Sequence, residues 1–353
     1  MNSENVIIEA SAVQRPAVTA WKVGHGWLSF LCGCVLGLIF MELALHKFVG
    51  KSENSSGSEV RTIREGIAVA HFAPDALRST GNPQIAGAPS ILVLGDSHVE
   101  AFQVSDKQTM GSVLERRLRS DRRAWNVLQY AFDGAVGPDY IYAAPLVLER
   151  YRPMRVFLIM NAGDFRTITI YTRLEEKNGE VTVAPLGPGI GRGRPASFGG
   201  PVVRKLKESA VFYSATLRLT LDILPKLRAG AVSAEQGGQG GGLASRELSI
   251  RSIELILRGL KEAYGDKLFI LYTPEQMYSR EDPPETQEAA LLSECQEQGM
   301  TCRSLRKRMV EGLLDKHEIA RGFTNTTPGF GHFNFHGHEM AAAELYDWQN
   351  SAP

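Results

Sequence analysis

The stretch ILVLGDS (91–97) decides the predicted fold of this chain. Its first part, ILVLG (91–95), is a short apolar run that ends in glycine, as buried strands of parallel sheets do. Apolar residues between 110 and 118 then recur at helical spacing. A buried strand followed by a helix is the repeating unit of a parallel sheet.

The same order of strand and helix recurs along the rest of the chain. Strands are predicted at NVLQYA (126–131), RVFLIM (155–160) and KLFILY (267–272), and helices at 138–151, 248–265 and 337–349. Alternation of this kind implies a parallel sheet with helices on both faces. We therefore expect an α/β fold, specifically a three-layer α/β/α domain.

The alternation of strand and helix patterns weakens between about 166 and 245. Two glycine-rich runs, 187–195 and 237–242, lie there, and only 202–224 has a helical pattern. A long interruption of a compact α/β domain is typical of an insertion or lid. The run GPGIGRG lacks the Gly-Lys-Ser/Thr ending of a phosphate-binding loop, so we interpret it as a flexible loop.

A second apolar segment, WLSFLCGCVLGLIFMELAL (27–45), holds nineteen residues and one charge, Glu42. About twenty apolar residues span the hydrocarbon core of a bilayer, so the segment predicts a transmembrane helix. Trp21 before the segment, Trp27 at its start, and His46 and Lys47 after it suit the membrane interface. Lysine and arginine flank the segment on both sides, so their count does not decide its orientation.

The stretch KSENSSGSE (51–59) is rich in serine and asparagine and is predicted to be a solvated linker. The predicted organisation is a tail at 1–26, a transmembrane anchor at 27–46, a linker and lead-in at 47–89, and a domain at 90–353. The expected protein is single-pass, with its domain periplasmic or otherwise extracytoplasmic. A membrane is therefore an expected partner through the N-terminal helix.

Charge and cysteine content narrow the function classes. Lysine plus arginine and aspartate plus glutamate both total 39, so no general positive field attracts nucleic acid, which is not an expected partner. Cys32 and Cys34 lie inside the apolar run and are interpreted as small apolar residues. Cys295 and Cys302 are able to close a small disulfide loop in an oxidising compartment, and the sequence leaves open whether they do.

Polar or glycine-containing loops follow three predicted strands, at the sheet edge where ligands bind in open α/β folds. Ser97 comes directly after Asp96 at the first strand-to-helix turn, which exposes its hydroxyl. Phe132-Asp133-Gly134 follows the second strand, and Asn161-Ala162-Gly163-Asp164-Phe165 follows the third. Glycine allows a backbone N–H to approach a ligand, and an asparagine amide is a candidate donor to an oxyanion. Taken alone, the first two loops are better explained as an ordinary cap and a plain turn, and the third is also compatible with a turn at a strand end.

A histidine-rich segment, HFNFHGH (332–338), precedes the last predicted helix. A serine hydroxyl is a poor nucleophile until a base within hydrogen-bond reach removes its proton, and histidine suits that task near neutral pH. A zinc site at His332, His336 and His338 is not predicted, because Gly337 interrupts a helix at that point. No metal or other cofactor is expected.

The order and spacing of these segments resemble the SGNH (GDSL-like) hydrolase superfamily, from about Ser90 to the C-terminus. The resemblance implies a flavodoxin-like sheet, with Ser97 as nucleophile and His332 as general base. It also implies an oxyanion hole formed by the backbone N–H of Ser97, that of Gly134 and a side-chain amide. Supporting roles fall to Asp96, Asp164, Asn334 and His338, of which His338 matches a histidine that is usually structural.

Two positions depart from the family pattern. Where the family has asparagine before the aspartate of its third block, this chain has Gly163, with Asn161 two residues upstream. Asn161 and Gly163 are both predicted oxyanion-hole residues: either Asn161 takes over as the amide donor, or the hole has one donor fewer.

The second departure concerns the acid that orients the base. The family's acid lies two or three residues before the histidine, but Phe330 and Gly329 occupy those positions here. No carboxylate lies nearby in the sequence, whereas Asn325 does. The sequence therefore predicts that Asn325 or a backbone carbonyl orients His332, which leaves a Ser–His dyad.

Three functions follow from this resemblance. The first is a serine esterase that forms an acyl-enzyme on esters of carbohydrate or lipid, with O-acetyl esters as the expected substrates. The second is an acyltransferase of the same fold that moves acetyl groups onto an exported polysaccharide. The third is a non-catalytic assembly module that has lost the acid and the amide.

Overall fold

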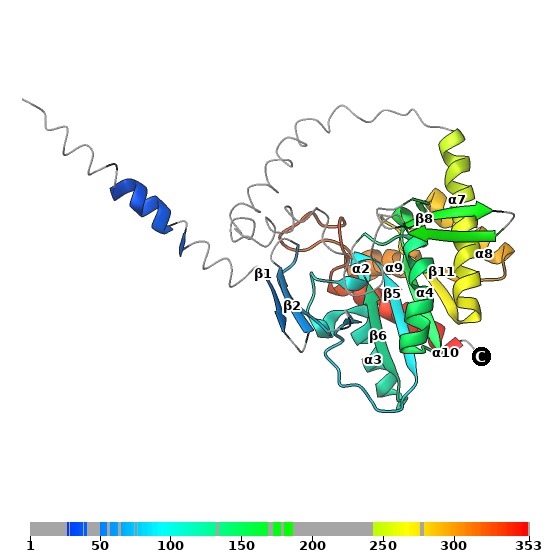
Figure 1. Cartoon of the computed structure of the whole chain (residues 1–353), viewed down its shortest axis with the longest axis horizontal. Helices are drawn as coiled ribbons and strands as arrows, with labels where there is room; N and C mark the ends of the chain where they lie inside the picture. The colour runs from blue at the N-terminus through cyan, green and yellow to red at the C-terminus, as the bar shows by residue number, and fades with distance from the viewer. Residues whose placement is uncertain are drawn as a thin grey trace, which may run out of the picture.

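The computed structural model describes residues 27, 29–37, 39–40, 50–54, 57–62, 65–73, 75, 77–131, 134–168, 172–177, 180–185, 243–275 and 279–351. Figure 1 shows the chain, with the central sheet and its helices forming one body. Phe132, Asp133, the predicted helix at 202–224 and both glycine-rich runs lie outside the described residues.

Within the described ranges, five parallel strands form the centre of a nine-stranded sheet. In spatial order they are β6 (Asn126–Ala131), β5 (Ser90–Gly95), β7 (Arg155–Met160), β10 (Leu268–Tyr272) and β11 (Thr301–Ser304). Numbered along the chain, this is the order 2-1-3-4-5 of doubly wound, flavodoxin-like sheets. The α/β fold with a mostly parallel central sheet is therefore confirmed.

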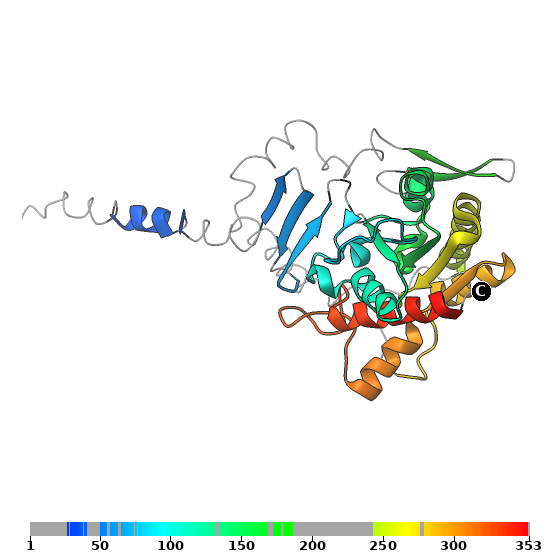
Figure 2. The same ribbon diagram turned by 90° about the horizontal axis from the view of Figure 1, so that it is seen from below.

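In the part of the chain that the structure describes, long helices cover both faces of the sheet (Figure 2). One face carries α3 (Met110–Ser120), α9 (Arg306–Lys316) and α10 (Phe335–Ser351), and the other carries α4 (Gly137–Tyr151), α7 (Leu243–Tyr264) and α8 (Thr286–Glu297). Alternate residues of β5 enter the two cores: Ile91 and Val93 contact the first set, and Leu92 and Leu94 the second. A strand buried on both faces explains its unbroken apolar sequence.

Short elements complete the domain. They are the helix α2 (Ser97–Glu100), the 3₁₀ turns η1 (Asp106–Gln108), η2 (Ala162–Phe165) and η3 (Gly265–Lys267), and the hairpin of β8 (Thr172–Lys177) and β9 (Glu180–Pro185). The hairpin lies in the predicted insertion at 166–245. It packs mainly against α4 and α7.

The predicted linker at 51–59 is wrong. Strands β1 (Gly50–Asn54), β2 (Gly57–Thr62), β3 (Ala68–Phe72) and β4 (Leu77–Arg78) form an antiparallel extension of the central sheet beyond β6. Pairing of β1 with β2 uses main-chain groups, which polar residues supply as well as apolar ones. The polar composition of 51–59 is therefore compatible with paired strands at Gly50–Asn54 and Gly57–Thr62.

Arg78 holds this extension against the rest of the domain. Its side chain is buried, and its guanidinium donates to the backbone carbonyls of Glu100 at 3.0 Å and Val104 at 2.9 Å. It also forms an ion pair with Asp106. Burial lowers the pKa of Arg78, and the Asp106 carboxylate counteracts that effect. The extension is thus tied to the segment that follows α2.

The described residues of the predicted anchor, within 27–40, are helical and their apolar side chains are exposed, as for Phe40 at 75%. Residues 28, 38 and 41–46 of that anchor lie outside the description. Of the helices within the described ranges, none combines the length and apolar composition needed to cross a bilayer.

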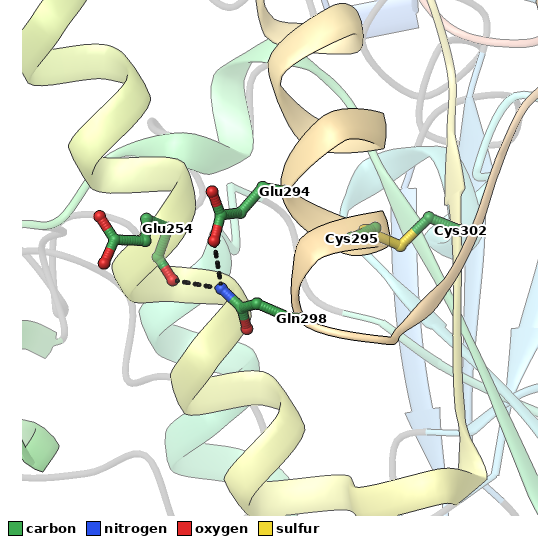
Figure 3. Close-up of a disulfide and its surroundings, with 5 residues drawn as sticks. All are labelled: Glu254, Glu294, Cys295, Gln298 and Cys302. Carbon is green, nitrogen blue, oxygen red and sulfur yellow. Dashed lines mark hydrogen bonds between the residues drawn. A yellow bond between two sulfur atoms is a disulfide. The ribbon is translucent and has the colours of Figure 1, made fainter.

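Cys295 on α8 and Cys302 on β11 form a disulfide, with their Cα atoms 6.1 Å apart (Figure 3). Between them, Gln298 donates from its amide to the Glu294 carboxylate at 2.7 Å and to the Glu254 backbone carbonyl of α7 at 3.3 Å. The bridge and this amide together fix the turn between α8 and β11.

We expect the unfolded, unreduced chain to titrate two thiols, those of Cys32 and Cys34, and the reduced chain to titrate four. Replacing Cys302 by serine should lower the free energy of unfolding by roughly 2–3 kcal/mol, because a small loop is then no longer closed in the unfolded state. Four reactive thiols without reductant would contradict the bridge.

Candidate active site

Ser97 stands at the point where β5 ends and α2 begins. Asp96 is the helix N-cap, and its carboxylate accepts from the backbone N–H of His98 at 2.9 Å. Gly95 is required by close packing, because a Cβ there would lie 2.5 Å from a methyl group of Val99. β5 lies between β6 and β7, where the order of the sheet reverses, and ligands bind at such switch points.

His332 lies beside Ser97, with its Nε2 2.9 Å from the serine Oγ. The segment that carries His332 is held by Asn334, whose amide donates to the backbone carbonyls of Ile319 at 2.7 Å and Gly322 at 2.9 Å. The oxygen of the same amide accepts from the backbone N–H of Gly337 at 3.2 Å, at the start of α10. Asn334 therefore supports the loop from which His332 projects.

Glu65 supplies the carboxylate that the sequence around His332 lacks. Its Oε2 lies 2.5 Å from His332 Nδ1, and its Oε1 accepts from the backbone N–H of His332 at 2.7 Å. Glu65 lies on the connection between β2 and β3, so it comes from the antiparallel extension and precedes Ser97 in the chain. Ser97, His332 and Glu65 form a continuous hydrogen-bonded chain.

The prediction that His332 has no carboxylate partner is therefore wrong. The physical reason is that the β2–β3 hairpin brings a residue 267 positions away into contact with the histidine. Asn325, the predicted orienting group, instead accepts from the backbone N–H of Gly66 at 3.0 Å. It thus supports the turn that carries Glu65.

Two glycines make room for this contact. A Cβ at Gly331 would lie 2.3 Å from Glu65 Oε1, and Gly331 has a φ of +83°. Gly66 has a φ of +73°, and a Cβ there would lie 2.5 Å from the backbone oxygen of Gln103. Side chains at either position would push the Glu65 turn away from His332.

The charges of the site fix the direction of each hydrogen bond. Burial raises the pKa of Glu65, but the hydrogen bonds from the ring and backbone of His332 outweigh it, so this pKa lies below its ordinary value. An ionised carboxylate only accepts, so His332 Nδ1 carries a proton and donates to Glu65. Nε2 then has a lone pair for the Ser97 hydroxyl, as a general base requires.

The backbone N–H groups predicted for an oxyanion hole lie on adjacent loops. Ser97 begins α2, where a helix leaves its first N–H groups without helical acceptors. Gly134 has a φ of +72° and follows β6, whose last residue, Ala131, pairs with Gly95 of β5. The two strand ends are therefore adjacent, which places both loops at the same edge of the sheet.

Asn161 and Gly163 do not contribute equally to the predicted oxyanion hole. The Gly163 N–H donates to Asn161 Oδ1 at 2.7 Å, so the prediction of Gly163 as an oxyanion donor is wrong. The Asn161 amide nitrogen donates to Asp96 Oδ2 at 2.9 Å. An amide carries two N–H groups, so Asn161 has a second one to offer to a ligand.

Asp164 and His338 are buried beneath the site. Asp164 Oδ2 accepts from the Asn161 backbone N–H at 2.6 Å and its Oδ1 from the Tyr140 hydroxyl at 3.3 Å, which shapes the η2 turn. Burial, reinforced by the charge of Asp96, raises the pKa of Asp164 well above its ordinary value. Burial lowers the pKa of His338 to about 3, so this residue is a neutral packing element.

Among the described residues, no group of three or more His, Cys, Asp or Glu side chains is arranged to hold a metal ion.

Comparisons with known proteins give no match to any family model and none to any curated protein sequence. Among solved structures, the chain is similar to the psychrotrophic esterase EstA from Pseudoalteromonas sp., with 11% identity over 74% of this chain and 99% of that one and a TM-score of 0.38. It is also similar to a lipase/acylhydrolase from Enterococcus faecalis, with 13% identity over 74% and 94% of the two chains and a TM-score of 0.38. A putative GDSL-like lipase from Parabacteroides merdae matches at 11% identity over 76% and 99%, with a TM-score of 0.37.

The Glu65–His332 pair should make stability depend on pH. Because the folded pKa of Glu65 lies below its ordinary value of 4.5, its contribution is complete above pH 4.5 and is lost as pH falls through the folded pKa. The difference in unfolding free energy between the wild type and Glu65→Gln should therefore shrink in acid. Denaturant unfolding across a pH series measures it.

Ser97→Ala is the control for this series, because it keeps the Glu65–His332 pair and should keep the pH dependence of the wild type. A difference between wild type and Glu65→Gln that is constant across the series, or that grows in acid, would contradict the assigned pair.

Proposed function

We propose that this protein is a serine ester hydrolase that works through an acyl-enzyme on Ser97. The observation that carries the proposal is the chain from Ser97 Oγ to His332 Nε2, at 2.9 Å, and from His332 Nδ1 to Glu65 Oε2, at 2.5 Å. Nucleophile, base and an acid that orients the base are the parts that acyl transfer needs, and they recur on unrelated folds.

In the acylation step, Ser97 Oγ attacks the ester carbonyl carbon while His332 Nε2 takes the hydroxyl proton. The C–O bond to the leaving alcohol then breaks, and His332 returns the proton to that alcohol. Glu65 stays ionised and stabilises the imidazolium that forms between the two events. Water repeats the sequence on the acyl-enzyme and releases the carboxylic acid.

The oxyanion of each tetrahedral intermediate is proposed to lie among the backbone N–H groups of Ser97 and Gly134 and the amide of Asn161. Donors fixed before the reaction stabilise developing charge without reorganising. The Asn161 amide suits this role because its oxygen is held by Gly163 and one of its N–H groups by Asp96. Its orientation is therefore set before substrate binds.

The proposed substrates are acyl esters of carbohydrate or lipid, with O-acetyl groups as the proposed acyl part. Transfer to a sugar hydroxyl would use the same acyl-enzyme, and the acceptor then replaces water. The alternative of a non-catalytic module depended on the loss of both the acid and the amide; Glu65 stands in the place of the acid, and the Asn161 amide is proposed as the missing donor. We further propose that residues 27–46 attach the protein to a membrane, with the catalytic domain outside the cytoplasm, since the described apolar side chains there are exposed.

Ser97→Ala and His332→Ala should each abolish most hydrolysis of a small aryl acetate. The double variant should be little slower than either single variant, because residues that act as a unit are not additive. Steady-state kcat and KM of the three variants test this. Glu59→Gln on β2 is the matched control and should leave the rate unchanged.

Activity that survives Ser97→Ala undiminished would contradict the nucleophile. Adding an oligosaccharide acceptor separates the two fates of the acyl group: an ester hydrolase releases free acetate, whereas acetylated oligosaccharide as the main product would replace hydrolysis by transfer.

A further inference from the structure

A buried arginine lies behind the proposed nucleophile. Arg321 comes from the segment between α9 and α10 and is 5% exposed. Its Nη1 donates to His98 Nε2 at 2.5 Å and to the Gly331 backbone carbonyl at 2.9 Å, and its Nη2 donates to the Pro274 carbonyl at 3.1 Å. The guanidinium also lies over the ring of Phe333, 4.6 Å from its centre.

This contact fixes the tautomer of His98. A guanidinium has donors and no acceptor, so His98 Nε2 must offer its lone pair to Arg321. The proton of the neutral ring is then on Nδ1, which donates to Asp96 Oδ1 at 3.1 Å. Burial lowers the pKa of His98, and the charge of Arg321 adds to that effect, so a neutral ring agrees with the geometry.

Asp96 links the orientation of His98 to that of Asn161, because its carboxylate accepts hydrogen bonds from both residues. One carboxylate oxygen of Asp96 accepts from the backbone and ring of His98, and the other accepts from the Asn161 amide at 2.9 Å. The Asn161 oxygen is occupied by the Gly163 N–H. The amide plane is therefore held at both ends, and its remaining N–H points in a direction that Asp96 sets.

Burying the charged Arg321 side chain among these partners costs folding free energy, which argues that it does more than fill space. The hydrogen-bond acceptors of Arg321 are two backbone carbonyls and a neutral imidazole, although a buried guanidinium is better stabilised by a carboxylate. Its Nε is buried, and no described residue is its hydrogen-bond partner. An apolar side chain would fill the same space without burying a charge, so what Arg321 specifically provides is its set of donors to His98 and to the Gly331 and Pro274 carbonyls.

We propose that Arg321 and His98 are positioning residues for the oxyanion hole. Arg321 selects the Nδ1–H tautomer of His98, His98 orients Asp96, and Asp96 directs the free N–H of Asn161 toward the oxyanion. The proposal rests on the proposed ester hydrolysis. In this proposal Arg321 and His98 contact neither the substrate nor the reacting atoms of Ser97, His332 and Glu65. Both act through Asp96 and Asn161.

Two isosteric substitutions of His98 separate its two contacts. In His98→Asn the amide nitrogen takes the place of Nδ1 and keeps the donor to Asp96. In His98→Gln the amide takes the place of Nε2, which keeps the contact with Arg321 and loses the donor to Asp96. We expect kcat for an aryl acetate to fall roughly 10- to 100-fold in His98→Gln with KM unchanged, and to stay close to wild type in His98→Asn, because a displaced oxyanion donor acts only in the transition state.

The same substitutions in an Asn161→Ala background test the path of the effect. If His98 acts through Asn161, His98→Gln should cause no further loss once the amide is absent. An equal loss in both backgrounds, or an equal loss in His98→Asn and His98→Gln, would overturn the proposal. His317→Asn, at the exposed end of α9, is the control and should leave kcat unchanged.

A measurement without substrate separates this proposal from the proposed function. Proton–nitrogen correlation spectra of the full chain should show the His98 proton on Nδ1, and Arg321→Met should allow the Nε2–H form to appear. A wild type with His98 protonated on Nε2 would overturn the positioning chain even if the enzyme is active. An inactive wild type with the Nδ1–H form would instead remove the ester hydrolysis, and the catalytic role of the two residues with it.

Discussion

The hydrogen bond between the Glu65 carboxylate and the His332 imidazole is the interaction on which the site depends. It fixes the imidazole tautomer, and through it the ability of Nε2 to accept the Ser97 proton. The second oxygen of the same carboxylate accepts from the His332 backbone, so the ring and its loop are held together. Without this pair, the chain retains a serine and a histidine but no group that sets their protonation.

This dependence gives the antiparallel extension a catalytic purpose. Strands β1 to β4 add little to the two apolar cores, yet the turn between β2 and β3 carries Glu65. Arg78 ties the extension to the carbonyls that follow α2, and Asn325 ties the Glu65 turn to the segment before His332. The carboxylate is thus delivered by a separate piece of sheet and is fixed by contacts on both sides of the nucleophile.

The parallel core could be predicted from the sequence because burial on both faces leaves continuous apolar runs such as ILVLG and RVFLIM. Ser97 and His332 could also be found from the sequence. Ser97 follows the strand run ILVLG, and His332 precedes the last helix. Glu65 could not be found in this way, because its partner is distant in sequence and its surroundings are polar. The alternation of AVAHF (68–72) after a Glu-Gly pair was the available signal of a hairpin, and Gly331 marked a position where another group comes close.

The rate at which a fluorophosphonate labels Ser97 tests the central claim most directly, because it needs no knowledge of the substrate. Glu65→Gln should slow labelling by about 10⁴-fold, the loss expected when a triad acid is replaced by its amide. Asn325→Ala should slow it less, since Asn325 acts only on the turn that carries Glu65. A labelling rate in Glu65→Gln equal to that of the wild type would contradict the account.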